Sequence, residues 1–304
     1  MNLAFCAYAH KENFQSGHNI NGLDARNVYL KNSFVALKSC KALAPADEVA
    51  LVTNVKLGDY WEKLFTRNGI KIIPVEYDCF QFESNYGWSL AFYKLCALKH
   101  VLNMEYEKVL LVDTDVYIQR PLDDIWEDAT ENILLYDISR GLYNGDYRIF
   151  TQESKAFMGT QENISRFGGE FIAGNRKDLR LFMAQCEDIY HRMRQQDFKT
   201  INGDEFVTSI AARRMREKVK NAAPYVFRYW TAWRWHYVCS NYSSNPVVVL
   251  HCPREKDHGF LKLFRKLEKG KKMPTASTVY RCLHLDLFSY MKIEIVRKLL
   301  LLRN

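Results

Sequence analysis

The strongest chemical signal in this 304-residue sequence is a pair of aspartates, Asp113 and Asp115, that directly follow an apolar run over residues 108–112. After Lys108 the run has no polar residue, which predicts a strand buried on both faces. If the chain stays extended, residues two apart point the same way, so the two carboxylates would lie side by side. Such oxygen ligands suit Mg²⁺ or Mn²⁺ bridging a diphosphate. The alternative interpretation is that Asp-x-Asp only begins a turn.

A histidine, His251, follows a second apolar run at residues 247–250. Ligands of open α/β sheets bind at the carboxyl ends of the strands, so an imidazole at this place is a candidate third metal ligand. It would move the preference of the site from Mg²⁺ toward Mn²⁺. The alternative is a structural histidine, which is the interpretation that we give to the seven other histidines.

The elements that must position these residues follow an alternating pattern. Short apolar runs predict strands at residues 3–8, 48–53, 71–75, 108–112, 133–136, 171–173 and 247–250. Segments of helical period predict helices at residues 28–40, 58–68, 89–102 and 178–193. Strand and helix in alternation are typical of an α/β fold with a mostly parallel central sheet flanked by helices.

Composition and charge narrow the class of protein. With 48% hydrophobic and 26% charged residues, the chain is expected to be globular and not disordered. The last 51 residues hold 13 of the 43 Lys and Arg but only 5 of the 35 Asp and Glu, so residues 1–253 are balanced at 30 of each. The eight cysteines are scattered without a Cys-x-x-Cys pair, which indicates free thiols in a reduced compartment and gives no expectation of a zinc knuckle.

The order of these motifs resembles glycosyltransferase family 8, the family of glycogenin and lipopolysaccharide galactosyltransferases, over about residues 1 to 258. The matching stretch is Val-Leu-Leu-Val-Asp-Thr-Asp-Val-Tyr at 109–117, followed by Pro-Leu-Asp-Asp-Ile-Trp at 121–126. The resemblance implies a GT-A nucleotide-sugar fold for residues 1–258. It also implies transfer of a hexose from a UDP-sugar to a carbohydrate acceptor, such as lipopolysaccharide or capsule, with retention of anomeric configuration.

The resemblance also implies roles for particular residues. Asp113, Asp115 and His251 would bind Mn²⁺ or Mg²⁺, and Asp113 would also contact the ribose. The other expected donor-binding residues are Tyr29, which would stack on uracil, Lys94, and Tyr8 at the end of the first strand.

Three segments depart from the family pattern: Gly168-Gly169-Glu170-Phe171, Gly203-Asp204-Glu205, and Cys252-Pro253-Arg254-Glu255-Lys256 after the histidine. A carboxylate near the anomeric carbon would stabilise its positive charge or act as nucleophile, so Asp204, Glu205 and Glu170 are the catalytic candidates. The alternative role for Asp204 is to cap a helix over residues 205–216.

Two further surfaces are expected outside this site. Trp233 and Trp235, in the aromatic segment 228–237, are candidates for an acceptor platform, with core packing as the alternative. Residues 259–304 are expected to form a basic, partly amphipathic helical region that binds an anionic membrane surface. The alternative is a terminal helix packed on the protein. No nucleic-acid module accompanies the charge, and no apolar run reaches the length of a membrane span, so the expected location is the cytoplasmic face of the membrane.

Two other functions remain open at this point. A non-catalytic glycan-binding or membrane-surface-binding protein on the same fold would explain the altered segments. Phosphatases of the haloacid dehalogenase type also place Asp-x-Asp after an apolar strand, but on the first strand, whereas three strands are expected before this one.

Overall fold

The computed structural model describes residues 1–12, 24–139, 144–231, 245–270 and 272–289, together with 291, 292 and 295. Their central feature is a seven-stranded sheet with the order β3-β2-β1-β4-β7-β6-β8. The strands are β1 (Leu3–Tyr8), β2 (Glu48–Thr53), β3 (Lys71–Pro74), β4 (Lys108–Val112), β6 (Ile133–Asp137), β7 (Phe167–Asn175) and β8 (Val219–Asn221). Only β7 runs antiparallel to its neighbours. The expected α/β fold with a mostly parallel sheet is therefore confirmed.

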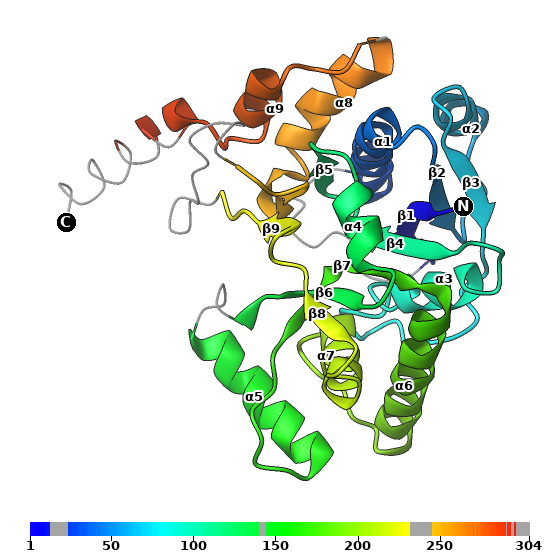
Figure 1. Cartoon of the computed structure of the whole chain (residues 1–304), viewed down its shortest axis with the longest axis vertical. Helices are drawn as coiled ribbons and strands as arrows, with labels where there is room; N and C mark the ends of the chain where they lie inside the picture. Colours follow the sequence, from blue (N-terminus) through cyan, green and yellow to red (C-terminus); the bar gives the residue numbers. More distant parts are fainter. Residues whose placement is uncertain are drawn as a thin grey trace.

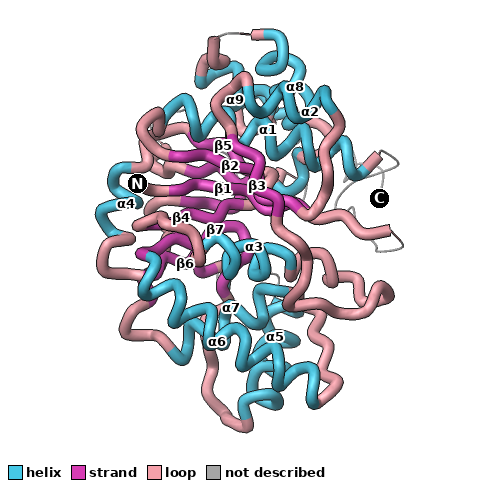
Figure 2. The backbone as a smooth tube through the Cα atoms, turned by 90° about the vertical axis from the view of Figure 1, so that its right-hand side faces the viewer, coloured by secondary structure: helices cyan, strands magenta, loops and turns pink. Residues whose placement is uncertain are grey.

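Helices cover both faces of this sheet (Figure 2). One face carries α1 (Ala25–Leu43), α2 (Asp59–Thr66), α4 (Asp123–Asp128), α8 (Gly259–Lys269) and α9 (Ala276–Cys282). The opposite face carries α3 (Tyr93–Val101), α5 (Asn144–Met158), α6 (Arg176–Gln195) and α7 (Asp204–Arg214). Alternate residues of β1 face the two layers: Ala4 and Cys6 pack toward α1, whereas Leu3 and Phe5 pack toward α3.

Strand β7 is longer than its sequence pattern indicates. Only residues 171–173 were expected, but the strand extends from Phe167 to Asn175. Three glycines at 168, 169 and 174 interrupt the apolar pattern, because glycine has no side chain to mark a buried face. The strand is nevertheless held by pairing with β4 on one side and β6 on the other.

A second, three-stranded sheet has the order β5-β10-β9 and lies beside the central sheet (Figure 1). Its strands are β5 (Val116–Ile118), β9 (Val226–Arg228) and β10 (Val249–His251), followed by a short 3-10 helix at Pro253–Glu255. Strand β10 pairs antiparallel with β5 and parallel with β9, so His251 lies opposite both Val116 and Arg228. This sheet brings distant segments of the chain to the end of β4.

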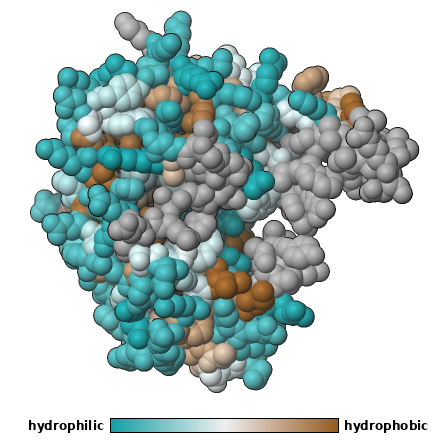
Figure 3. Space-filling view, turned by 180° about the vertical axis from the view of Figure 1, so that it is seen from behind, coloured by the Kyte–Doolittle hydropathy of each residue, from teal (hydrophilic) through white to brown (hydrophobic). Residues whose placement is uncertain are grey.

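The first two helices beyond residue 258 pack on the body of the protein. Helix α8 lies along α1, and its apolar face, including Phe264, is buried in the same core as α1 and β1. Its basic residues Lys262, Arg265, Lys266 and Lys269 are exposed. The segment through α9 therefore combines a packed apolar face with a solvated basic one. Among the described residues, no helix is long and apolar enough to span a membrane, and the face seen in Figure 3 is mainly hydrophilic, with hydrophobic side chains confined to small patches.

Replacement of Phe264 tests how much the packing of α8 contributes to stability. The ring is 4% exposed and contacts Phe34 edge-on at 5.6 Å between ring centroids. We expect Phe264→Ala to lower the free energy of unfolding by about 3–5 kcal/mol, because it removes a buried ring and leaves a cavity. Phe288→Ala, at a ring that is 76% exposed, is the matched control and should change it by less than about 0.5 kcal/mol. Equal effects in urea unfolding would contradict this packing.

Candidate active site

The three residues expected to bind a metal come together at the junction of the two sheets. Asp113 directly follows β4, and Asp115 directly precedes β5. Because β10 pairs with β5, His251 arrives beside Asp115, and the Cys252 amide donates to the Asp115 carbonyl at 3.0 Å. One ligand atom from each of Asp113, Asp115 and His251 lies within 4.8 Å of the other two. Asp-x-Asp does form a turn here, and the same turn brings its two carboxylates toward His251.

The Asp115 carboxylate is fully buried, and within the described part of the chain its two oxygens accept no hydrogen bond. His251 Nε2 and Lys256 Nζ each lie 3.3 Å from Oδ2. Burial by itself favours the neutral acid, but these two cations hold the pKa of Asp115 well below its usual range. A buried carboxylate with unsatisfied oxygens, beside a second carboxylate and an imidazole, fits a divalent cation.

His251 is held between two carboxylates. Its Nε2 faces Asp115, while Nδ1 lies 3.2 Å from Glu170 Oε1. Burial opposes protonation, but Asp115 and Glu170 raise the pKa of His251 to about 9. A hydrogen bond from Nδ1 to a carboxylate fixes the ring so that Nε2 is free to bind a metal, an arrangement that many metal-binding histidines use.

Glu170 lies behind His251 rather than on the pocket wall. The pairing of β7 with β4 brings it beside Asp113, whose amide donates to the Glu170 carbonyl at 3.0 Å. Its carboxylate is buried and accepts two hydrogen bonds from Arg228, Nε at 2.7 Å and Nη2 at 2.6 Å. Although burial opposes ionisation, Arg228 and His251 hold the pKa of Glu170 well below its usual range.

A pocket of about 230 Å³ opens over the metal-ligand cluster. The expected donor-binding residues Tyr8, Tyr29 and Lys94 all line it. The Tyr8 and Tyr29 rings lie side by side with their centroids 6.0 Å apart, and Lys256 Nζ lies 5.6 Å from the centre of the Tyr29 ring. The pocket therefore has an aromatic wall next to a cationic one.

Lys94, on α3, contacts two carboxylates. Its Nζ lies 3.0 Å from Asp204 Oδ2 and 3.7 Å from Asp113 Oδ2, and it donates to the Gly169 carbonyl at 3.1 Å. A side-chain carbon at Gly169 would lie only 2.3 Å from Asp204 Oδ2 and 2.7 Å from Lys94 Nζ, so this ion pair requires glycine in β7. Although burial opposes it, the two carboxylates keep the pKa of Lys94 above its ordinary value.

Asp204 and Glu205 begin α7 and both line the pocket, but their charges differ in how they are balanced. Asp204 is the first helical residue and Gly203 is the N-cap, so the alternative role of Asp204 as a helix cap is wrong. Burial raises the pKa of Asp204 to about 6. Lys94 opposes this rise only in part, because its ammonium is shared with Asp113, and the adjacent Glu205 carboxylate adds to the rise. Glu205 instead contacts two guanidinium groups, Arg166 Nε at 2.9 Å and Arg228 Nη2 at 3.0 Å.

Several residues of the pocket were not anticipated by motif, among them Lys256, Arg228 and Trp88. Lys256 ends the Cys-Pro-Arg-Glu-Lys segment that departs from the family pattern. The only feature of the sequence that points to Lys256 is that it is a basic residue shortly after His251. Arg228 and Trp88 carry no local signal of their own. The expected acceptor residues Trp233 and Trp235 lie outside the described residues, whereas the neighbouring Trp230 lines the pocket.

The reversed strand β7 beside β4, the Asp-x-Asp turn at the end of β4 and the attached small sheet together define a GT-A glycosyltransferase fold. Two solved structures share it over most of the chain. Mouse xyloside xylosyltransferase 1 in its apo form is 14% identical, with 83% of this chain and 97% of that chain covered and a TM-score of 0.54. The galactosyltransferase LgtC in complex with donor and acceptor sugar analogues is 16% identical, with 93% and 100% covered and a TM-score of 0.54.

No protein-family model and no curated protein matches the sequence. The identities to the two solved structures are low, so the likeness establishes the fold alone. The GT-A fold that the resemblance to family 8 implies is thereby confirmed. A first-strand phosphatase motif does not fit this arrangement, because Asp-x-Asp follows the fourth strand of the chain.

Removal of Arg228 tests how much its buried ion pairs with Glu170 and Glu205, here called the buried charge network, contribute to stability. Arg228→Met leaves Glu170 and Glu205 without their shared cation, and we expect the free energy of unfolding to fall by about 3–5 kcal/mol. Arg216→Met is the control, because that guanidinium is 65% exposed and pairs with its exposed neighbour Glu217. It should cost less than about 1 kcal/mol. Urea unfolding of the metal-free protein measures both, and equal losses would refute the network.

The pH dependence of stability tests Asp204. Burial raises the pKa of Asp204 from its ordinary value of 3.8 to about 6 in the folded protein, so the folded state binds more protons than the unfolded state between these two pH values. The contribution of Asp204 to the free energy of unfolding is therefore present at low pH and is lost as pH rises from about 4 to 6. We expect Asp204→Asn to become more stable relative to wild type by up to about 3 kcal/mol between pH 4 and pH 7.5. A difference in unfolding free energy that does not change with pH would contradict this assignment.

Proposed function

We propose that this protein is a metal-dependent glycosyltransferase that moves a hexose from a UDP-sugar to a carbohydrate acceptor, with retention of anomeric configuration. The observation that carries the proposal is the cluster of Asp113, Asp115 and His251 at the floor of a pocket in a GT-A fold. Lys94 and Lys256 flank the cluster, so the pocket is built for a polyanion.

The main energetic barrier to sugar transfer comes from the charge that develops on the departing group. Loss of a nucleoside diphosphate leaves negative charge on the departing group, and stabilising that charge lowers the barrier. Mn²⁺ or Mg²⁺ held by Asp113, Asp115 and His251 would neutralise part of the charge on the diphosphate. Lys94 and Lys256 supply two further cations, and their ammonium groups are held by ion pairs with Asp204 and Asp115.

The pocket walls support positions for the rest of the donor. In this proposal uracil would stack on the Tyr8 and Tyr29 rings, which lie side by side in the pocket wall, and Asp113 would accept a hydrogen bond from the ribose. We propose that Asp204 is the carboxylate nearest the anomeric carbon. It lines the pocket, and the Lys94 ammonium that pairs with it is shared with Asp113. Glu205 is paired twice, which makes it a weaker nucleophile.

Glu170 acts as a positioning residue in this proposal. Its carboxylate is held by Arg228 and contacts His251, so its effect on the donor is exerted through the imidazole. The acceptor is a glycan such as lipopolysaccharide or capsule. The exposed basic residues of α8 would then hold the enzyme at the anionic membrane surface that carries such an acceptor.

Calorimetric titration with UDP in the presence of Mn²⁺ tests the donor site. We expect the native protein to bind, and Asp113→Asn with Asp115→Asn to weaken binding by at least about 100-fold, because a pair of metal ligands is lost. The control is Asp123→Asn with Asp124→Asn, an exposed acidic pair at the start of α4 that should leave binding unchanged. No binding by the native protein, or equal binding by both double variants, would overturn the proposal.

A panel of UDP-sugars with glycan acceptors separates an enzyme from a binding protein. Release of UDP that depends on metal and acceptor supports transfer. UDP binding with no release from any donor would instead favour a non-catalytic glycan-binding protein on the same fold.

A further inference from the structure

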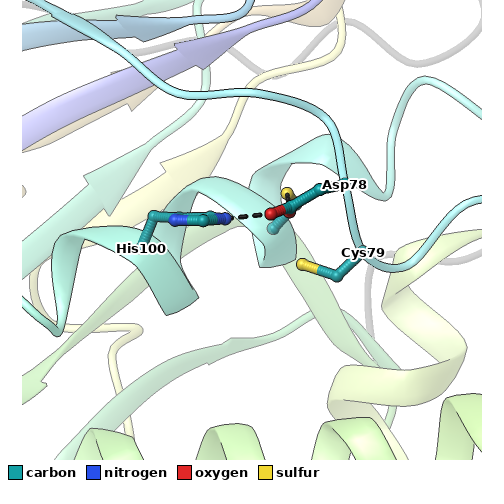
Figure 4. Close-up of side chains that lie close together, drawn as sticks. Asp78, Cys79 and His100 are labelled. Carbon is teal, nitrogen blue, oxygen red and sulfur yellow. Dashed lines mark hydrogen bonds and ion pairs between the residues drawn. The ribbon is translucent and has the colours of Figure 1, made fainter.

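A second group of metal-ligand side chains lies outside the candidate active site. Its members are Asp78, Cys79, Cys96 and His100, and one ligand atom from each lies within 4.8 Å of the other three. Asp78 and Cys79 belong to the loop after β3, whereas Cys96 and His100 belong to α3. Figure 4 shows Asp78, Cys79 and His100 converging from these two segments.

The chain conformation brings these four residues together. Cys96 and His100 are four residues apart on α3 and so lie on one face, one turn above the other. In the loop, Phe80 has a positive φ of 57°, which is rare for a bulky residue and turns the chain directly after Cys79. The Tyr77 hydroxyl donates to the carbonyls of Phe80 at 3.1 Å and Ser89 at 2.5 Å, which holds the loop closed.

The donor set is that of a soft, tetrahedral metal. It contains two free thiols, one imidazole and one carboxylate. Ligand atoms around tetrahedral zinc lie roughly 3.3–3.8 Å apart, as bond lengths of about 2.0–2.3 Å require. Here His100 Nε2 lies 2.8 Å from Asp78 Oδ1, and Cys96 Sγ lies 3.4 Å from the same oxygen. Small side-chain adjustments would therefore place all four around one ion.

The cluster is accessible to an ion from one side. Both thiols would bind the metal as thiolates, with their protons released to solvent. Cys96 is buried, whereas the His100 and Asp78 side chains are 34% and 49% exposed, so an ion can enter from solvent.

We propose that Asp78, Cys79, Cys96 and His100 bind one zinc ion in a structural site that joins the loop after β3 to α3. Thiolate ligands select zinc over the Mn²⁺ or Mg²⁺ of the candidate active site. A zinc knuckle was not expected from the sequence, because no Cys-x-x-Cys pair is present; the site proposed here joins two separate segments instead. The proposal is independent of the proposed function, since it concerns none of the residues of that pocket.

The site would stabilise one wall of the pocket. The loop that contains Asp78 and Cys79 continues to Gly87, Trp88 and Leu90, which line the pocket. Trp88 packs against Gly203, where a side-chain carbon would lie 3.1 Å from its ring. Helix α3 also carries Lys94. A zinc ion would therefore hold the loop that contributes Trp88 against helix α3, which contributes Lys94.

Metal analysis of the purified full-length protein tests the site. Protein loaded with Zn²⁺ and dialysed against a weak chelator should retain one zinc per chain, and Co²⁺ in its place should show thiolate-to-cobalt charge transfer and a tetrahedral ligand-field spectrum. Cys79→Ser with Cys96→Ser should lose both. Because Cys96 is buried and its replacement risks misfolding, His100→Gln is the second variant. It should weaken zinc binding at least about tenfold, while His191→Gln on α6, an exposed histidine, should not.

The outcomes separate this site from the candidate active site. Asp113→Asn with Asp115→Asn should keep the zinc, and zinc should raise the melting temperature of the native protein more than that of His100→Gln. No zinc retained by the native protein, or equal retention by His100→Gln and His191→Gln, would overturn the proposal. So would a Cys79–Cys96 disulfide in the protein as isolated.

Discussion

The whole arrangement depends on burying several carboxylates at the place where the two sheets meet. Five acidic side chains face five basic ones at this junction: Asp113, Asp115, Glu170, Asp204 and Glu205 against Lys94, Lys256, Arg166, Arg228 and His251. Burying any one of these charges without a partner would cost several kcal/mol. Of the five basic side chains, only the His251 imidazole can exchange its proton for a metal ion. A divalent ion bound there would add positive charge to the junction, and a bound diphosphate can offset that charge.

The fold provides this junction through a change of sheet. The chain leaves the central sheet at the end of β4 and enters the small sheet at β5, so the Asp-x-Asp turn spans the boundary between them. Strand β7 approaches from the other side and contributes glycine where the Lys94–Asp204 pair passes close to its backbone. The segment that departs from the family pattern at Gly168-Gly169 is therefore a requirement of the charge network in this chain.

The two metal-ligand clusters would act on one pocket in different ways. The oxygen-rich cluster lies on its floor and would contact the donor. The thiol-containing cluster joins α3 to the loop that supplies Trp88, and would hold a wall in place without touching substrate. The ligand types keep the two separate, because carboxylates favour Mn²⁺ or Mg²⁺ and thiolates favour zinc. Helix α8 is a further case of two roles in one element, with a buried apolar face and an exposed basic one.

Local pattern was sufficient to predict β1 and β4 at their observed bounds, the mostly parallel sheet, and the place of Asp113 and Asp115, because uninterrupted apolar runs mark buried strands. His251 was predicted as a third metal ligand from its place after an apolar run and from the resemblance, and the β5–β10 pairing is what brings it beside Asp115. Arg228 has no signal in spacing or periodicity, and in the second cluster only Cys96 and His100, four residues apart on α3, are related by spacing. Contacts between charges and ligands distant in the chain depend on how strands and loops meet in three dimensions, and a one-dimensional pattern does not contain that information.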